Sequence, residues 1–304
     1  MTARGENAAH RRVVFASPGE RTSSDPAREL EVELSWHAVT HVGHRRETNQ
    51  DSYAVVPPVF AVADGMGGHS AGEIASEAVI RRLADLGGTR AVGPADIEAA
   101  LGDAVEDIEL NAGESELGAG TTVTGVVLGS DPGAPSWLVF NIGDSRVYQF
   151  YRGSLTQVTV DHSVVQHLLD TGAISPEEAE FHPHANVITR AVGFNEEPVP
   201  DFAELALIPG QRLLICSDGL TKELTEIGLQ HFLSEADTAE AAATLLLEHA
   251  LDNAGRDNVT AVVIDVHAVG DDRDTQDLSG IVLADTAETP VVGGGALEAE
   301  PVAD

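Results

Sequence analysis

Residues 136–160 read SWLVFNIGDSRVYQFYRGSLTQVTV, three apolar runs that are separated by short turns. β-Branched and aromatic residues dominate the runs, and Gly or Asp stands at the breaks, as is typical of strands. The second and third runs are joined only through Tyr151-Arg152-Gly153, which is too short for the crossover that parallel strands need. The stretch therefore predicts antiparallel hairpins, in a fold where strands outnumber helices.

The same signals recur on both sides of this stretch, with helical patterns between them. Ser175, Pro176 and Glu178 form a clear helix start, and Asp237 is the expected N-cap of the last helix. Two long helices early, one late and many antiparallel strands predict a layered α+β sandwich. The other strand candidates are 30–39, 51–56, 59–64, 121–129, 201–207, 212–218 and 258–266, and the helix candidates are 70–86, 94–110, 163–172, 175–181 and 237–255.

The chain has two polar ends around one expected domain. Residues 1–30 carry no sustained hydrophobic period, which predicts a flexible N-terminal arm. Residues 269–304 hold nine Asp or Glu against one Arg, which predicts a disordered acidic tail. No break in composition divides residues 31–268, so a single domain is expected there.

Charge and cysteine content narrow the classes of function. Fifty Asp and Glu against 17 Lys and Arg give a net charge of −33, which argues against nucleic acid and an anionic membrane surface as partners. Cys216 is the single cysteine, so neither an internal disulfide nor a thiolate zinc cage is expected. With no signal-peptide core and no run near the roughly 18 apolar residues of a membrane span, we predict a cytoplasmic protein.

Acidic residues stand where apolar strands end. Asp64 follows VFAVA, Asp144 follows WLVFNIG, Asp218 follows RLLICS, and Asp257 precedes NVTAVVIDV. One such Asp is ordinarily a turn residue, but four that converge need a cation to stay ionised together. Oxygen-only ligation selects Mg²⁺ or Mn²⁺, and two such ions about 4 Å apart can activate a water and clamp a phosphoryl oxygen.

The stretch 61–73, AVADGMGGHSAGE, adds a glycine-rich turn between a strand and a helix. Such a turn suggests bound phosphate, yet Asp64 would repel it unless a metal lies between the two. Gly65 has no side chain, so its carbonyl can approach a metal closely. Arg46 in HRRETNQDS is a candidate to hold two phosphate oxygens, although taken alone it reads more simply as a solvated surface charge.

In their order these motifs resemble one family, the metal-dependent Ser/Thr protein phosphatases of type 2C. The resemblance rests on RETNQD, VADGMGGH, GTTVTGVVL, NIGDSRVY, DHS, CSDGL and GRDNVT, which together span roughly residues 35–266. One tetrapeptide matches easily by chance, whereas an ordered set of seven motifs is specific. The resemblance implies a four-layer α-β-β-α sandwich, with two central antiparallel sheets flanked by helix pairs, and makes 31–268 the catalytic domain.

The resemblance also implies roles for the acidic residues. Asp64 would bridge two Mg²⁺ or Mn²⁺ ions, with the Gly65 carbonyl on one ion and Asp218 and Asp257 completing the other. Asp144 would match the ligand of a third, weaker metal. The expected reaction is hydrolysis of phosphoserine and phosphothreonine in phosphorylated proteins, by direct attack of a metal-bridging water. The expected setting is a monomeric signalling enzyme that opposes bacterial Ser/Thr kinases.

Arg46 would hold the substrate phosphate, and two neighbouring motifs depart from the family pattern. Gln50 stands where the family often has Glu, and its amide can hydrogen-bond metal-bound water but adds no charge. Met66 stands where animal-type members have a histidine thought to act as general acid. His69 is then the nearest candidate to protonate the leaving alkoxide, and a histidine bonded locally at a helix start is an equal alternative.

Other readings of the sequence compete less well. A cysteine phosphatase needs Arg six residues after its catalytic Cys, and the residue six after Cys216 is Lys222. The G-x-S-x-G motif of serine hydrolases is absent. A dinucleotide loop at 65–70 lacks its third glycine. Two alternatives stay open: a pseudophosphatase that binds a partner without turnover, and an enzyme that hydrolyses only small phosphoesters.

Overall fold

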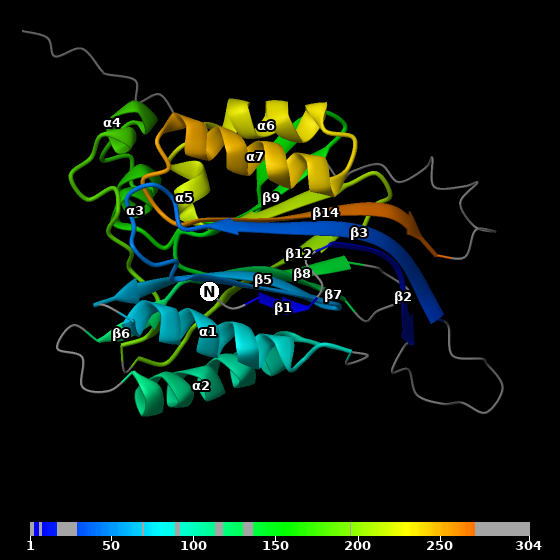
Figure 1. Ribbon diagram of the computed structural model, residues 1–304, viewed down its shortest axis with the longest axis horizontal. Coiled ribbons are helices and arrows are strands. Elements are labelled where there is room, and N and C mark those ends of the chain that lie inside the picture. The colour runs from blue at the N-terminus through cyan, green and yellow to red at the C-terminus, as the bar shows by residue number, and fades with distance from the viewer. Residues whose placement is uncertain are drawn as a thin grey trace, which may run out of the picture. The chain divides into compact units, whose positions relative to one another are not determined.

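Two β-sheets pack face to face between two pairs of helices (Figure 1). The computed structural model describes residues 3–5, 8–16, 29–68, 70–88, 92–112, 118–129, 136–194 and 196–270. All of these belong to one unit that ends at Gly270. The expected acidic tail lies outside the described residues from 271 onward, whereas residues 269 and 270 are described and Val269 ends strand β14. In the expected N-terminal arm, residues 1–2, 6–7 and 17–28 lie outside the described residues.

The first sheet is antiparallel except at one edge. Its central strands pair in the order β4, β5, β7, β8 and β12, and β1 joins β4 in parallel. The short strands β6 and β11 extend β5 at the end that carries Gly65 and Gly67. The bounds are β1 Ala3–Gly5, β4 Asp51–Val56, β5 Val59–Gly67, β6 Ala119–Thr121, β7 Val123–Leu128, β8 Ser136–Ile142, β11 Val192–Gly193 and β12 Asp201–Ala206.

The second sheet is antiparallel throughout its described strands and follows the order β10, β9, β13, β14, β3 and β2. Strands β1 and β2 fall within the expected N-terminal arm, where the sequence had suggested no secondary structure. β2 pairs along most of β3, whose thirteen residues offer an edge long enough to hold it. The bounds are β2 Ala8–Ala16, β3 Glu29–His41, β9 Arg146–Tyr151, β10 Ser154–Gln157, β13 Arg212–Cys216 and β14 Val259–Val269.

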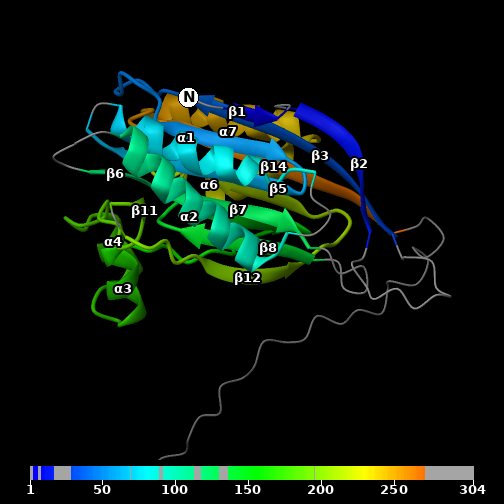
Figure 2. The ribbon, with the colours of Figure 1, turned by 90° about the horizontal axis from the view of Figure 1, so that it is seen from below.

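Helices cover the outer face of each sheet. α1 and α2 lie on the first sheet, and α6 and α7 lie on the second. In the view of Figure 2, α2 runs across β7 and β8, while α1 lies nearer β5. The short helices α3 and α4 lie next to each other, away from the two sheets (Figures 1 and 2), whereas the short helix α5 packs against β14 and α7. The bounds are α1 Ala71–Ala84, α2 Pro94–Asn111, α3 Val164–Asp170, α4 Pro176–Glu180, α5 Asp218–Thr221, α6 Glu226–Glu235 and α7 Ala239–Asn253.

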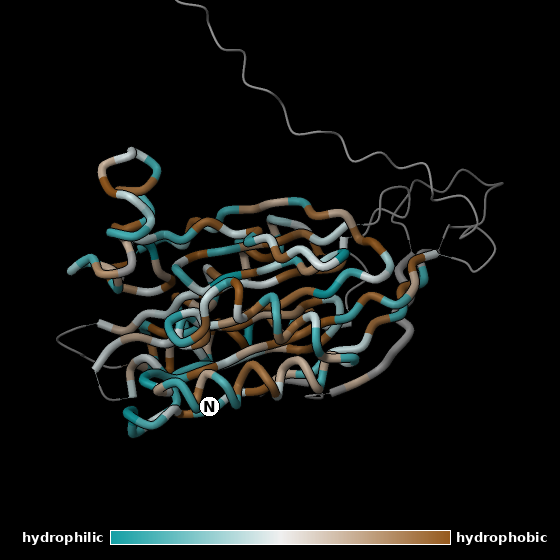
Figure 3. Tube along the Cα trace, turned by 90° about the horizontal axis from the view of Figure 1, so that it is seen from above, coloured by the Kyte–Doolittle hydropathy of each residue, from teal (hydrophilic) through white to brown (hydrophobic). Residues whose placement is uncertain are grey.

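Three apolar clusters fill the spaces between the four layers, which confirms the predicted α-β-β-α sandwich. Strand side chains alternate between faces, so the first sheet sends Ala61 toward α1 and Phe60 toward the second sheet. In the central cluster the ring of Phe60 packs edge-on between Trp36 and Trp137, at centroid distances of 5.3 and 6.2 Å. Figure 3 shows apolar segments following the strands through this interior.

Local signals in the sequence are mostly confirmed. Arg152 and Gly153 form the β9–β10 turn with φ of 50° and 80°, the positive values that a tight two-residue hairpin requires. Ser175 and Glu178 make the predicted reciprocal capping bonds at the start of α4. The predicted cap of α7 is wrong by one residue, because the Thr238 side chain, rather than that of Asp237, accepts from the backbone N–H of Ala241.

The helix α6 was not predicted. Leu229 and Leu233 are buried one turn apart, and the side chain of Thr225 caps the first turn. Gly228 lowers helix propensity and Ile227 is 83% exposed, so the apolar pattern over these ten residues is weak. α6 completes the second helix pair. Among the described residues, no helix is long and apolar enough to span a membrane.

Candidate metal centre

Asp64 lies on β5 and its main chain is clamped by the threonines of the GTT segment. The hydroxyl of Thr122 accepts from the Asp64 N–H at 3.1 Å, and the Asp64 carbonyl accepts from the Thr122 N–H at 2.9 Å. The Thr121 hydroxyl donates to the same carbonyl at 2.9 Å. On the other side Asp51 of β4 stands in register with Asp64. Asp64 is therefore fixed by neighbouring strands on both sides.

Gly65 has no room for a side chain. A Cβ on it would lie 2.1 Å from the Gly72 carbonyl oxygen in the first turn of α1 and 2.7 Å from the Gln50 carbonyl oxygen. The Gly65 N–H donates to that same Gln50 oxygen at 3.1 Å. The absence of a side chain at Gly65 therefore allows α1 to pack against the end of β5. This packing role is additional to the one suggested by the sequence, in which the Gly65 carbonyl can approach a metal closely.

Asp218 and Asp257 come from segments that meet because β13 and β14 are antiparallel neighbours. Asp218 follows β13 and begins α5, while Asp257 precedes β14, so both lie at the same edge of the sheet. A Cβ on Gly219 would lie 1.9 Å from the Asn258 carbonyl oxygen, which shows how closely the two segments pack. Antiparallel pairing therefore places two acids that are distant in sequence side by side.

Asn258 ties this edge to the loop before β4. Its side-chain amide donates to the carbonyls of Val42 and Thr48, both at 2.9 Å, and its side-chain oxygen accepts from the Gln50 N–H at 2.8 Å. The loop so held carries Arg46, whose guanidinium makes a two-pronged contact with Asp257 at 2.8 and 3.0 Å. Arg46 therefore lies among the acids of the centre, with its guanidinium on a carboxylate.

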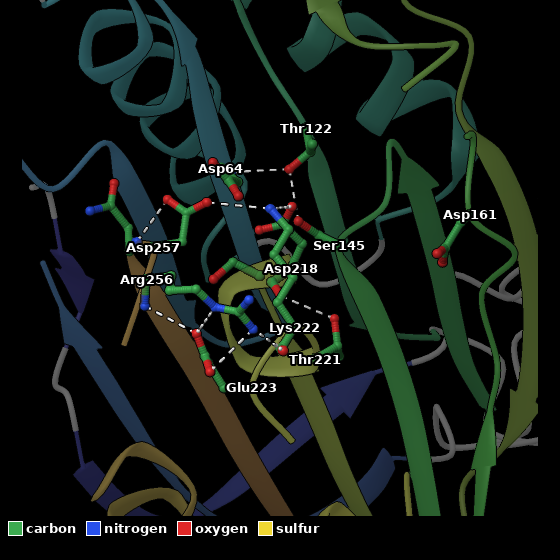
Figure 4. A network of polar contacts seen from close by, with 12 residues as sticks. Asp64, Thr122, Ser145, Asp161, Asp218, Thr221, Lys222, Glu223, Arg256 and Asp257 are labelled. Carbon is green, nitrogen blue, oxygen red and sulfur yellow. Dashed lines mark hydrogen bonds and ion pairs between the residues drawn. The ribbon is translucent and has the colours of Figure 1, made fainter. Parts of the chain in front are cut away.

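Lys222 is a second cation at the centre. Its ammonium forms an ion pair with Asp218, four residues earlier on α5, and lies 3.3 Å from Oδ2 of Asp257 (Figure 4). Burial would lower the pKa of Lys222, but the carboxylates of Asp218, Asp257 and Asp64 outweigh burial and raise it. The lysine is therefore firmly charged among these acids.

Asp144 sits on the turn where the chain crosses from β8 in the first sheet to β9 in the second. Two contacts fix this turn: the Ser145 hydroxyl lies 2.8 Å from that of Thr122, and the Gly143 N–H donates to His162 Nδ1 at 3.2 Å. Arg146 next to it makes a bidentate ion pair with Asp161, with contacts of 2.6 to 3.1 Å. The turn is thus joined to the segment that leads into α3 and α4.

Repulsion among buried carboxyls dominates the electrostatics. Burial raises the pKa of Asp51 to about 7 and that of Asp144 to about 7, with Asp218 adding to both shifts. Burial, and then Asp51 and Asp218, raise the pKa of Asp64 well above its ordinary value. Burial would also raise the pKa of Asp257, but Arg46 and Lys222 hold it below the ordinary value. Of these four carboxyls, only Asp257, which contacts both cations, has a pKa below its ordinary value.

A pH dependence follows for the metal-free chain. In the folded state Asp51 and Asp144 hold protons up to a pKa of about 7, against an ordinary value of 3.8. The folded state therefore binds more protons than the unfolded state between these values, and stability falls as pH rises through about 7. In chelator we expect the melting temperature to drop on the order of 5 °C from pH 5 to pH 8.

Calorimetry in chelator at several pH values measures this slope. Asp51→Asn should flatten it, because the amide keeps its hydrogen bonds from Ser217 and Thr260 without a titrating proton. A melting temperature that is constant or rises over this range contradicts the assignment.

The donor set fits hard divalent cations. Oδ1 of Asp218 and Oδ1 of Asp51 are buried and accept no hydrogen bond, although unpartnered carboxylate oxygens are costly to bury. Among the described residues, no three His, Cys, Asp or Glu side chains form a closed ligand group. Lys222 and Arg46 sit on the carboxylates of Asp218 and Asp257, so these acids are already paired with cations.

The structure brings five of the six described candidates into one cluster, namely Arg46, Asp64, Asp144, Asp218 and Asp257, with Gly65 adjoining on β5. His69 lies outside the described residues. Sequence reasoning missed Asp51 and Lys222. Asp51 closes the RETNQD motif, and Lys222 stands one helical turn after Asp218, so both carried a positional signal.

Known proteins share this sequence pattern and fold. A family model described as protein phosphatase 2C matches residues 40–255. Serine/threonine protein phosphatase PstP of Mycobacterium tuberculosis is 40% identical over 245 residues, which cover 77% of this chain and 45% of PstP. The chain thus spans less than half the length of that relative. Serine/threonine phosphatase stp of Listeria innocua is 32% identical over 248 residues, which cover 77% of this chain and 97% of stp.

Solved structures of bacterial phosphatases have the same fold as this chain. The crystal structure of the M. tuberculosis phosphatase PstP/Ppp superimposes with a TM-score of 0.71 at 36% identity, covering 78% of this chain and 100% of that one. The catalytic domain of PstP in complex with two manganese ions gives 0.67 at 36% identity, covering 79% and 100%. With a family model over most of its length and this shared sandwich, the chain belongs to the protein phosphatase 2C family.

Proposed function

We propose that this chain is a Ser/Thr phosphoprotein phosphatase that works with two Mg²⁺ or Mn²⁺ ions. The observation that carries the proposal is the cluster of Asp51, Asp64, Asp144, Asp218 and Asp257 at one rim of the sandwich, with two buried carboxylate oxygens that accept no hydrogen bond. Membership in the protein phosphatase 2C family supports the reaction class. The manganese-bound PstP domain supports the choice of metal.

Four groups are proposed to hold the two ions: the carboxylates of Asp64, Asp218 and Asp257 and the carbonyl of Gly65. Asp144 is proposed for a third ion. When bound, the ions would supply an activated water and neutralise charge on the phosphoryl oxygens. Asp64 is proposed to contact both ions. Thr121 and Thr122 immobilise its main chain, so the backbone that carries its carboxylate need not become ordered when metal binds.

Arg46 is proposed to bind the substrate phosphate, and to do so its guanidinium must exchange Asp257 for phosphate oxygens. The two contacts to Asp257 already have the forked geometry that a phosphate offers. His69 is proposed as the general acid. We further propose that the enzyme acts in the cytoplasm on proteins phosphorylated by Ser/Thr kinases.

The function is tested with the purified full chain. Release of phosphate from a phosphothreonine peptide and of nitrophenol from p-nitrophenyl phosphate is followed in Mn²⁺, with and without chelator. Metal-dependent turnover of the peptide supports the proposal. Turnover of the aryl ester alone favours a small-ester hydrolase, and no turnover on either substrate favours a binding module. Activity that survives chelator overturns the metal mechanism.

Arg46→Ala should raise KM for the phosphopeptide and the inhibition constant of inorganic phosphate by about tenfold or more, because two charge-assisted hydrogen bonds are lost. Arg46→Lys should recover only part of the loss, since an ammonium cannot make the forked contact. Steady-state kinetics with phosphate as product inhibitor measures both. Unchanged phosphate inhibition in Arg46→Ala would refute the assigned role.

A further inference from the structure

Lys222 is the only lysine among the 304 residues, the other 16 of the 17 basic residues being arginine. It lies among the acids of the candidate metal centre, where its side chain is 32% exposed. The chain has a net charge of −33, and its one lysine contacts two of the acids of this centre.

The Lys222 ammonium joins two acids from different segments. It pairs with Asp218 at the start of α5 and lies 3.3 Å from Oδ2 of Asp257, which precedes β14. In Figure 4 the lysine side chain runs up from the end of α5 toward these carboxylates. Its charge reduces the repulsion between two acids that the antiparallel strands force together.

The backbone from which this side chain extends is held on both sides. The Lys222 N–H donates to the Asp218 carbonyl at 2.8 Å, and the Lys222 carbonyl accepts from the Arg256 guanidinium at 3.1 Å. Arg256 is fixed in turn by Glu223, which accepts from its Nε at 2.9 Å and from its N–H at 3.1 Å. The stem of Lys222 is thus anchored beside the segment that carries Asp257.

The carboxylates that Lys222 contacts are two of those proposed to hold a divalent ion. The ammonium contacts Oδ2 of both acids and leaves Oδ1 of Asp218 open. A dication on that open oxygen would share the Asp218 carboxylate with the ammonium, and the two positive charges would repel at this short distance. A lysine has a flexible four-carbon stem with a point charge at its end, so it can withdraw without moving the anchored backbone. In the described part of the chain, the ion pairs of Lys222 are with Asp218 and Asp257, and neither involves Asp64 or the Gly65 carbonyl.

We propose that Lys222 is a tethered counter-ion that occupies the Asp218–Asp257 side of the centre until a divalent ion displaces it. This inference rests on the proposed function. It makes loading sequential: the ion at Asp64 and Gly65 binds first, and the ion at Asp218 and Asp257 binds only at a higher metal concentration, because it must also expel the ammonium.

Manganese titration of the full chain tests the proposal. After metal is stripped with chelator, free Mn²⁺ is measured by electron paramagnetic resonance in wild type, Lys222→Met, Lys222→Arg and Arg152→Met. Lys222→Met should bind the weaker ion about tenfold or more tightly, because the competing charge is gone and the stem length is kept. Lys222→Arg keeps the charge and should remain within about threefold of wild type.

Arg152→Met removes the same charge from the exposed β9–β10 turn and is the matched control. It should leave both manganese affinities unchanged. Equal affinities in wild type and Lys222→Met overturn the counter-ion role. If neither protein binds Mn²⁺, the proposed metal centre itself fails, which is a different result.

A second measurement uses wild type alone and so does not depend on the folding of a variant. With ¹³Cε-labelled lysine, the chain gives a single lysine side-chain signal, because Lys222 has no lysine neighbour to confuse it with. Titration with diamagnetic Mg²⁺ should move this signal as the weaker site fills. A signal that stays in place while Mg²⁺ saturates the protein overturns the proposal.

Discussion

Asp64→Asn lowers kcat/KM for a phosphothreonine peptide by at least about 10³-fold, equivalent to about 4 kcal/mol of lost transition-state stabilisation. Asp64 is the acid proposed to contact both ions, and an amide supplies neither the negative charge nor a second anionic oxygen. The variant should also lose most of its Mn²⁺ affinity. Steady-state kinetics and the manganese titration measure the two losses separately.

The same substitution should stabilise the metal-free chain. In the wild type, burial and the neighbouring acids, with Asp51 first among them, raise the pKa of Asp64, so its ionised form is costly in the folded state. An asparagine removes that cost, and the melting temperature in chelator at pH 8 should rise. Asp252→Asn, on an exposed residue of α7, controls for net charge and should change neither quantity. Turnover near the wild-type rate in Asp64→Asn would disprove the two-ion mechanism.

The positions of the acids could be predicted because strand ends are visible in sequence. An apolar run that stops at Asp, as at Asp64 and Asp218, marks the point where a buried strand reaches the rim of its sheet. Antiparallel neighbours then bring the end of one strand to the start of the next, which is how Asp257 joins Asp218. The fold class followed from the same strands and their short turns.

The pairing of side chains could not be predicted in this way. Arg46 meets Asp257 across 211 residues, through a loop that Asn258 holds by three hydrogen bonds to main-chain groups. Patterns among residues that are near one another in sequence do not predict such a long-range contact. The reach of Lys222 back to Asp218 is a local i,i+4 relation and was accessible from sequence, but its approach to Asp257 depends on how α5 packs against the segment before β14.

Gly219→Ala should disrupt the centre without changing a single charged group. A Cβ at Gly219 would lie 1.9 Å from the Asn258 carbonyl oxygen, and a main-chain oxygen cannot rotate away as a side chain can. The Asp257–Asn258 segment must shift, so Asp257 moves relative to Asp218, and the hydrogen bonds of Asn258 are strained. We expect destabilisation of about 3 kcal/mol or more and Mn²⁺ affinity reduced at least about tenfold.

Urea unfolding and the manganese titration measure these two effects. Gly102→Ala is the matched control, because Gly102 lies inside α2 and a Cβ there would meet nothing within 4 Å. That substitution should stabilise the chain by about 0.5–1 kcal/mol, since alanine loses less backbone freedom in a helix. The contrast separates close packing from helix propensity. If Gly219→Ala instead keeps wild-type stability and manganese affinity, close packing of these segments does not fix the spacing of Asp218 and Asp257.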